Sequence, residues 1–174
     1  MIDFLKIYDL ERYLFDEVGP RFRSKKEIDP TDFFMIFIWK SNRAKTKTRD
    51  RLKKVAKGDF SDAVKEISKA LSSAETAKDR LAILVDVWGL RLPMASAILT
   101  VLYPDEFTVY DIRVCRVLNL TYRDYLTYSE NCWVEYERYK REVYNNTPST
   151  LSLRDRDRYL WGKSFYHDAA MDAQ

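Results

Sequence analysis

The chain has 174 residues, 46% of them apolar and 33% charged, which predicts one folded domain rather than a disordered or membrane-spanning protein. Only four glycines and five prolines are present, which argues against sandwiches, barrels and dinucleotide-binding folds, because those folds need glycine-rich turns. One histidine and two separated cysteines argue against a zinc or iron–sulfur site, so we expect no metal and no cofactor. The longest apolar run, 33–39, is far shorter than the roughly 20 residues of a membrane span. We therefore expect an all-α, cytoplasmic protein that does not bind membranes.

Apolar residues recur near the helical period of 3.6 along most of the chain, which predicts about nine helices in one unit. Gly19 and Pro20 are expected to stop the first helix. The second is apolar on every side, which indicates a central, buried position. The four tryptophans are expected mostly in the core. The predicted helices span residues 2–18, 30–39, 46–57, 59–71, 73–87, 94–103, 112–118, 129–144 and 152–161.

The net charge of +3 is unevenly distributed. Residues 21–57 hold thirteen basic and four acidic side chains, so this segment carries +9 and the rest of the chain carries −6. A polyphosphate partner such as DNA would favour this arrangement, because neutralised phosphates release counterions. A solvated helix face would also produce it, and charge alone leaves both interpretations open.

A tight break between two predicted helices carries the most specific pattern. Residues Trp88 to Ala95 predict the end of one helix, a turn that contains a glycine, and the start of a second helix. Asp111 follows sixteen residues after Ala95. This resembles the helix-hairpin-helix DNA glycosylase superfamily, over about residues 30–118. Segments 39–43 and 92–99 are similar to uncharacterised bacterial proteins that resemble this superfamily. That similarity implies a fold and does not imply an activity. The resemblance implies a two-lobed fold within a single domain, 1–174. One lobe would span about 27–103, with the hairpin at 80–102, and the other about 1–20 plus 111–174.

The resemblance also implies site residues. Asp111 takes the place of the catalytic carboxylate, which would stabilise a cationic sugar and orient water on a flipped nucleotide. The polar residues after the buried helix take the place of those that wedge into DNA, and the glycine turn would bring backbone N–H groups close to a phosphate. The expected nucleic-acid-binding residues are Lys40, Ser41, Asn42, Arg43, Lys45, Lys47, Gly89, Leu90 and Arg91.

Two positions depart from the family pattern. Arg91 replaces a second glycine, which would strain the turn by about 1 kcal/mol if that position needs a positive φ. Pro93 replaces the lysine of lyase members and cannot form a Schiff base, so an active protein would be monofunctional, with water as nucleophile. Lys40, which directly follows the buried run, is the one substitute amine that we nominate.

Simpler interpretations stay open beside these. Asp111 precedes an apolar helix and could serve only as its N-cap, and Gly89 could be an ordinary helix end. The chain could be a base-excision enzyme, a non-catalytic DNA- or RNA-binding module, or a protein-interaction domain whose basic face meets an acidic partner. An enzyme requires Asp111 to open onto a cavity. The oligomeric state stays open, with a monomer favoured.

Overall fold

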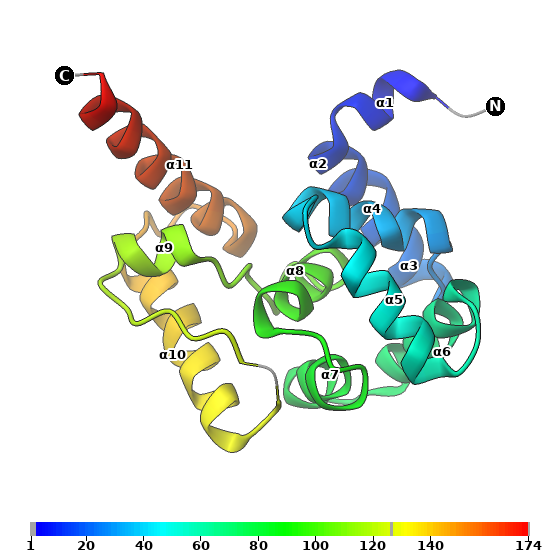
Figure 1. The fold of residues 1–174 in the computed structure, drawn as a ribbon. Helices are drawn as coiled ribbons and strands as arrows, with labels where there is room; N and C mark the ends of the chain where they lie inside the picture. Colours follow the sequence, from blue (N-terminus) through cyan, green and yellow to red (C-terminus); the bar gives the residue numbers. More distant parts are fainter. Residues whose placement is uncertain (1–2, 126, 174) are drawn as a thin grey trace.

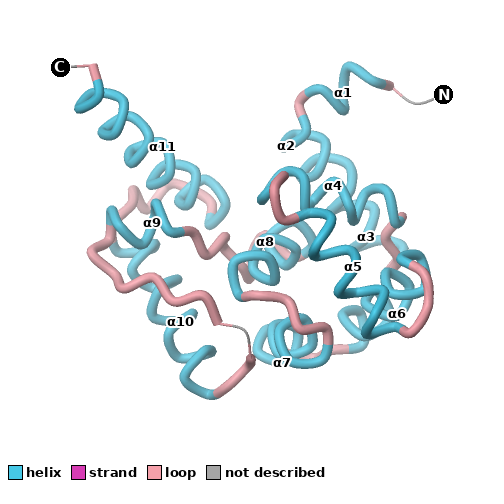
Figure 2. Tube along the Cα trace, viewed as in Figure 1, coloured by secondary structure: helices cyan, strands magenta, loops and turns pink. Residues whose placement is uncertain are grey.

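The computed structural model describes residues 3–125 and 127–173, and every regular element within these ranges is a helix, which confirms the all-α class (Figures 1 and 2). Two of the elements, η1 and η2, are single turns of π-helix. In chain order the elements are α1 (Phe4–Tyr8), α2 (Leu10–Tyr13), η1 (Leu14–Val18), α3 (Gly19–Lys25), α4 (Pro30–Ser41), α5 (Lys45–Ala56), α6 (Phe60–Ser73), α7 (Ala77–Ala82), η2 (Ile83–Val87), α8 (Leu92–Leu102), α9 (Ile112–Val117), α10 (Glu130–Asn145) and α11 (Leu153–Asp172).

Polar caps start several helices where the sequence indicates them. The Asp29 side chain accepts from the Thr31 N–H, and Asp59 and Asp62 form a reciprocal capping box. Ser152 caps α11, which continues well beyond the predicted end at residue 161. The chain beyond that point has no proline to stop a helix, and its aromatic side chains are largely exposed instead of packed.

The first predicted helix end is wrong. Gly19 and Pro20 do not stop the N-terminal helix, which runs on through α3 to Lys25. The π-turn η1 precedes them, and the Gly19 N–H donates to the carbonyl of Leu14, five residues back. A proline normally breaks a helix because it removes a hydrogen bond and its ring meets the carbonyl four residues earlier. The wider π-turn relaxes the ladder at this point, so the chain continues helical.

The core lies around α4 and α8. Ten of the eleven residues of α8 are buried, and α4 buries Phe33, Ile36 and Phe37. The N-terminal helices were expected to join residues 111–174, but they pack mainly on α4 and α8. The reason is that Leu14 and Phe22, both almost fully buried, face this core.

The last three helices form the C-terminal lobe, residues 112–172. Helix α11 packs against both α9 and α10, and Figure 1 shows the three together on one side of the molecule, with α8 between them and the N-terminal helices. The loop from α8 to α9 therefore joins the two parts of the fold, and it ends at Asp111.

Candidate functional site

The segment that leads into Asp111 is buried without being part of any helix, and side chains satisfy its backbone. The Tyr136 hydroxyl accepts from the N–H of Thr108 at 3.0 Å and donates to the carbonyl of Thr108 at 2.8 Å. The Tyr139 hydroxyl donates to the Val109 carbonyl at 2.6 Å. An unmade hydrogen bond at a buried backbone group costs about 1–3 kcal/mol. These contacts from α10 therefore fix the backbone immediately before Asp111.

Asp111 has two partners, one for each carboxylate oxygen. Its Oδ1 accepts from the Arg113 N–H at 2.8 Å, which confirms that it is the N-cap of α9. Its Oδ2 accepts from the Lys40 ammonium at 2.7 Å. The Lys40 and Asp111 side chains are 12% and 20% exposed, so this ion pair is largely shielded from solvent. The pair connects the last turn of α4 with the start of α9.

Asp111 opens onto a cavity of about 450 Å³, which lies within the range of sites that hold small molecules. We call it the Asp111 cavity. The enzyme interpretation requires that Asp111 opens onto a cavity, and this requirement is met, although the same carboxylate also caps α9. The residues that line it are Glu11, Trp39, Lys40, Val109, Asp111, Val114, Arg154, Asp157, Arg158 and Trp161.

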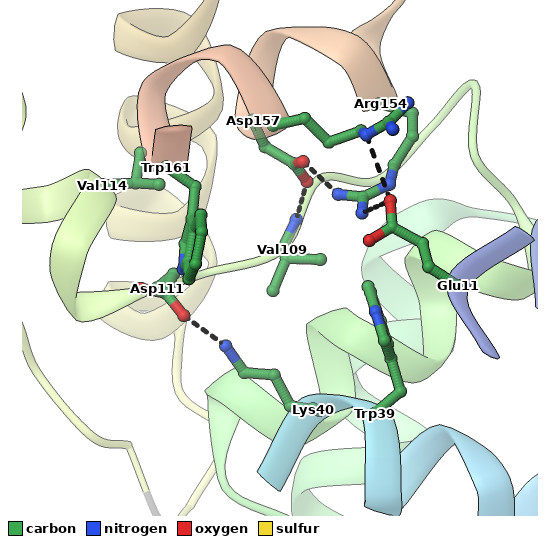
Figure 3. A pocket seen from close by; sticks show the side chains of 10 residues that line it. Glu11, Trp39, Lys40, Val109, Asp111, Val114, Arg154, Asp157 and Trp161 are labelled. Atoms are coloured by element: carbon green, nitrogen blue, oxygen red, sulfur yellow. Dashed lines mark hydrogen bonds and ion pairs between the residues drawn. The ribbon is translucent and has the colours of Figure 1, made fainter. Parts of the chain in front are cut away.

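Two indole rings flank this cavity. Figure 3 shows Trp161 beside Asp111 on one side of the open space and Trp39 beside Glu11 on the other. Trp161 is 44% exposed, so the expectation of a core position is wrong for this residue. Aromatic faces that border an open space offer stacking surfaces for a flat, π-bonded ligand.

An arginine closes the far end of the cavity. The Arg154 guanidinium lies against two rings that contact each other edge to face, with its central carbon 4.6 Å from the Phe15 centroid and 5.2 Å from that of Trp39. It donates to Glu11 at 2.7 Å and also to Asp157 (Figure 3). Burial raises the pKa of Asp157 from 3.8 to about 6, although the charge of Arg154 opposes the rise. The cavity thus places a carboxyl that titrates near neutrality beside a fixed cation.

A second depression, of about 330 Å³, lies between the start of α5 and the turn that contains Gly89. We call it the basic groove. Five of the nine predicted nucleic-acid-binding residues line it: Lys40, Ser41, Lys47, Leu90 and Arg91. Arg51 lines it as well and was not among the predicted residues. Lys40 lines both the basic groove and the Asp111 cavity, so the two depressions share a wall.

The other four predicted residues lie around the groove without lining it. Asn42 and Arg43 are exposed in the turn between α4 and α5, and the Lys45 ammonium donates to the Asn42 side chain. The carbonyl of Gly89 accepts from the guanidinium of Arg51. Gly89 itself has a φ of +61°, the left-handed region that favours glycine.

The turn is shaped differently from a phosphate-binding loop that offers all its amides. The Leu90 N–H already donates to the Leu84 carbonyl at 2.9 Å, and the Leu92 N–H donates to the Tyr125 carbonyl at 3.1 Å. Arg91 has a φ of −71°, so its replacement of glycine causes no strain. Its guanidinium forms an ion pair with Asp124. The positive charge on this wall of the basic groove therefore comes from side chains more than from the backbone amides of the turn.

Sequence reasoning missed Glu11, Arg154, Asp157 and Trp161 as cavity residues. They come from both ends of the chain, where only the alternating charges of residues 154–158 gave any signal.

The two cysteines are buried, and burial raises the pKa of each thiol to about 11, so neither is a nucleophile at neutral pH. Among the described residues, no helix is long and apolar enough to cross a membrane.

Comparisons with protein-family models, curated proteins and solved structures find no match.

Proposed function

We propose that this chain binds DNA and hydrolyses the N-glycosidic bond of a nucleotide rotated out of the duplex, with Asp111 as the catalytic carboxylate. The observation that carries the proposal is the position of Asp111 at the cavity beside the basic groove, with Lys40 in the wall of both. A bound backbone in the groove would then place one nucleotide next to the cavity.

Each part of the site has a task in this reaction. Lys47 and Arg51 neutralise phosphates, which gives affinity without sequence preference. The indoles of Trp39 and Trp161 stack against the rotated base. The Asp111 carboxylate stabilises the positive charge that develops on the sugar as the bond to the base breaks, and it orients the attacking water.

The test uses a panel of duplexes with damaged or modified bases, in which abasic sites are scored by alkaline cleavage. Asp111→Asn should bind the same duplexes and excise nothing, because asparagine retains the cap and removes the charge. The expected loss is at least about a hundredfold in rate. Asp59→Asn changes an equivalent N-cap on α6, away from the cavity, and should keep full activity. Excision by Asp111→Asn at the wild-type rate would contradict the proposal.

A second candidate function is a DNA- or RNA-binding module without chemistry. The observation that favours it is that both oxygens of Asp111 already have partners, Arg113 and Lys40, which is the arrangement of a purely structural residue. This alternative expects duplex binding and a wholly negative excision panel. Under it, Asp111→Asn also strengthens binding slightly, since a negative charge near the phosphates is removed.

A further inference from the structure

The basic groove contains an acidic side chain among its cations. Four of the described residues that line it are basic: Lys40, Lys47, Arg51 and Arg91. The carboxylate is that of Asp124, which forms an ion pair with Arg91. The Asp124 and Arg91 side chains are 32% and 47% exposed. Ion pairs with such exposure contribute little to the stability of a fold, so this pair can exchange partners readily.

Asp124 lies in residues 119–125, which follow α9, and we call this segment the strap. Two contacts to the buried Tyr110 hold it in place. The ring of Tyr122 stacks on that of Tyr110, with centroids 5.3 Å apart and planes 19° apart. The Arg123 N–H donates to the Tyr110 hydroxyl at 2.9 Å. The position of Asp124 in the groove is therefore built into the fold.

The strap brings two oxygen acceptors to the start of α8. The Tyr125 carbonyl accepts from the Leu92 N–H at 3.1 Å, and the Asp124 carboxylate accepts from the Arg91 guanidinium. A phosphate group offers the same kind of acceptor, and a guanidinium binds carboxylates and phosphates with the same fork of donors. In the free protein, the strap therefore occupies the donors that a phosphate would use at this end of the groove.

We propose that Asp124 takes the place of a DNA phosphate on Arg91 in the free protein, and that a phosphate of a bound strand replaces it. The inference rests on the proposed function for the binding of DNA, and it adds a self-inhibiting contact to that function. Only the partner of Arg91 changes in this exchange, and no covalent bond forms or breaks.

The exchange selects ligands that carry several linked phosphates. A single anion would gain nothing at Arg91, because it replaces one negative partner with another. A strand of DNA also reaches Lys47 in the same groove, so it adds a contact that Asp124 does not offer. The displaced carboxylate stays beside the strand and repels it. The strap therefore lowers affinity for DNA of every sequence.

The experiment measures the binding of a short, unmodified, fluorescein-labelled duplex to the full chain by anisotropy over a range of salt concentrations. Asp124→Asn keeps the size of the side chain and removes its charge, so a phosphate competes with a weaker partner. Affinity at low salt should rise by about fivefold, and the log–log salt slope should become steeper by about 0.9, because the contact at Arg91 then releases counterions in full. Asp105→Asn, an exposed position beyond the opposite end of α8, is the control with the same charge change and should leave affinity near that of the wild type.

A double variant separates occupation of Arg91 from general repulsion of the strand. Arg91→Gln removes the guanidinium for which Asp124 and the phosphate compete. In that background, Asp124→Asn should change affinity by less than about twofold, because the two effects are coupled. A gain from Asp124→Asn that is equally large with and without Arg91 would overturn the inference, since the carboxylate would then act through its charge alone.

The remaining outcomes are also decisive. Wild type and Asp124→Asn that bind the duplex with equal affinity refute the inference and leave the proposed function standing. An equal gain from Asp105→Asn refutes it in the same way. Binding by Asp124→Asn in the absence of binding by the wild type supports the inference in its strongest form. If neither binds at low salt, with helical circular dichroism intact, both proposals are refuted together.

Discussion

The Asp111 carboxylate contributes to stability in two ways, as the N-cap of α9 and as the ion-pair partner of Lys40. One oxygen of Asp111 caps α9 and the other meets the ammonium, so different substitutions remove different parts. From the sequence alone, Asp111→Asn is expected to change stability by only a few tenths of a kcal/mol, since asparagine caps well. The ion pair revises that expectation, because the variant leaves a shielded ammonium without its counter-charge.

We predict that Asp111→Asn lowers the free energy of unfolding by about 1–2 kcal/mol, because a hydrogen bond between charged groups is lost. Asp111→Ala should lower it by about 1 kcal/mol more, since the cap is lost too. Urea titrations of the single and double variants with Lys40→Met should give a coupling energy near 1 kcal/mol. Additive effects would show that the pair contributes nothing to stability.

Asp157 predicts a pH dependence of stability. Its carboxyl has a pKa of about 6 in the folded chain and an ordinary pKa of 3.8 in the unfolded chain, so the folded chain binds more protons between these pH values. The contribution of Asp157 to the free energy of unfolding therefore increases as the pH falls from about 7 toward 4. The stability of the wild type relative to Asp157→Asn should increase over the same interval.

Carboxyl NMR signals of α11 test the same prediction directly. The Asp157 signal should titrate with a midpoint near 6. Asp155, two residues earlier, is the internal control, because the Ser152 hydroxyl and the Arg158 charge hold its pKa below 3.8. A midpoint for Asp157 at or below that of Asp155 would show that Arg154 outweighs the burial.

At the scale of elements, the two helical glycines have opposite surroundings. Gly19 lies where the N-terminal helix crosses α8, and a Cβ there would collide with the Val101 carbonyl oxygen. Gly162 lies within α11, and a Cβ there would meet nothing within 4 Å. The same substitution should therefore change stability in opposite directions at the two positions.

We predict that Gly19→Ala lowers the free energy of unfolding by about 1–3 kcal/mol, as other overpacked sites do. Gly162→Ala should raise it by about 0.5–1 kcal/mol, because alanine favours the helix. Chemical denaturation of the two variants measures both values. Equal effects in the same direction would rule out the close crossing of α3 and α8.

Local signals in the sequence predicted most of the helices, but they could not predict contacts between elements that are distant in the chain. Short polar residues marked the starts of α4 and α11, because capping depends on neighbours along the chain. Lys40 and Asp111 were each singled out, but nothing in either segment indicates that they meet across 71 positions. Packing angles decide such contacts, and hydrophobic periodicity does not encode those angles.

At the scale of the whole molecule, ion pairs join the two parts of the fold on both sides of the Asp111 cavity. Lys40 and Asp111 connect α4 with α9, while Arg154 and Arg158 of α11 reach Glu11 of α2 at 2.7 and 3.1 Å. Many of the basic side chains of residues 21–57 lie on α5 and in the turn before it. Within the described residues, Arg43, Lys45 and Lys47 form no ion pair, so their charges are those that we expect a duplex to meet first.

We predict that duplex affinity falls steeply with salt, with a log–log slope of about −0.9 for each phosphate contacted. The triple variant Arg43→Glu, Lys45→Glu, Lys47→Glu should bind all sequences more weakly and with a shallower slope. A matched variant with Lys65, Lys69 and Lys163 changed to glutamate alters the net charge equally on exposed positions away from the groove. Equal losses in both variants would indicate a general charge effect, and binding independent of salt would favour an acidic protein partner.

The two indoles that border the Asp111 cavity also give the molecule an optical signal. Trp88, by contrast, is only 3% exposed and lines neither depression described above. A flat ligand that stacks on Trp39 or Trp161 would quench their emission and leave that of Trp88 unchanged. Collisional quenchers such as acrylamide would lose access to Trp161 on the same occasion. Occupancy of the cavity can thus be followed by the intrinsic fluorescence of the unlabelled chain, before any product of a reaction is known.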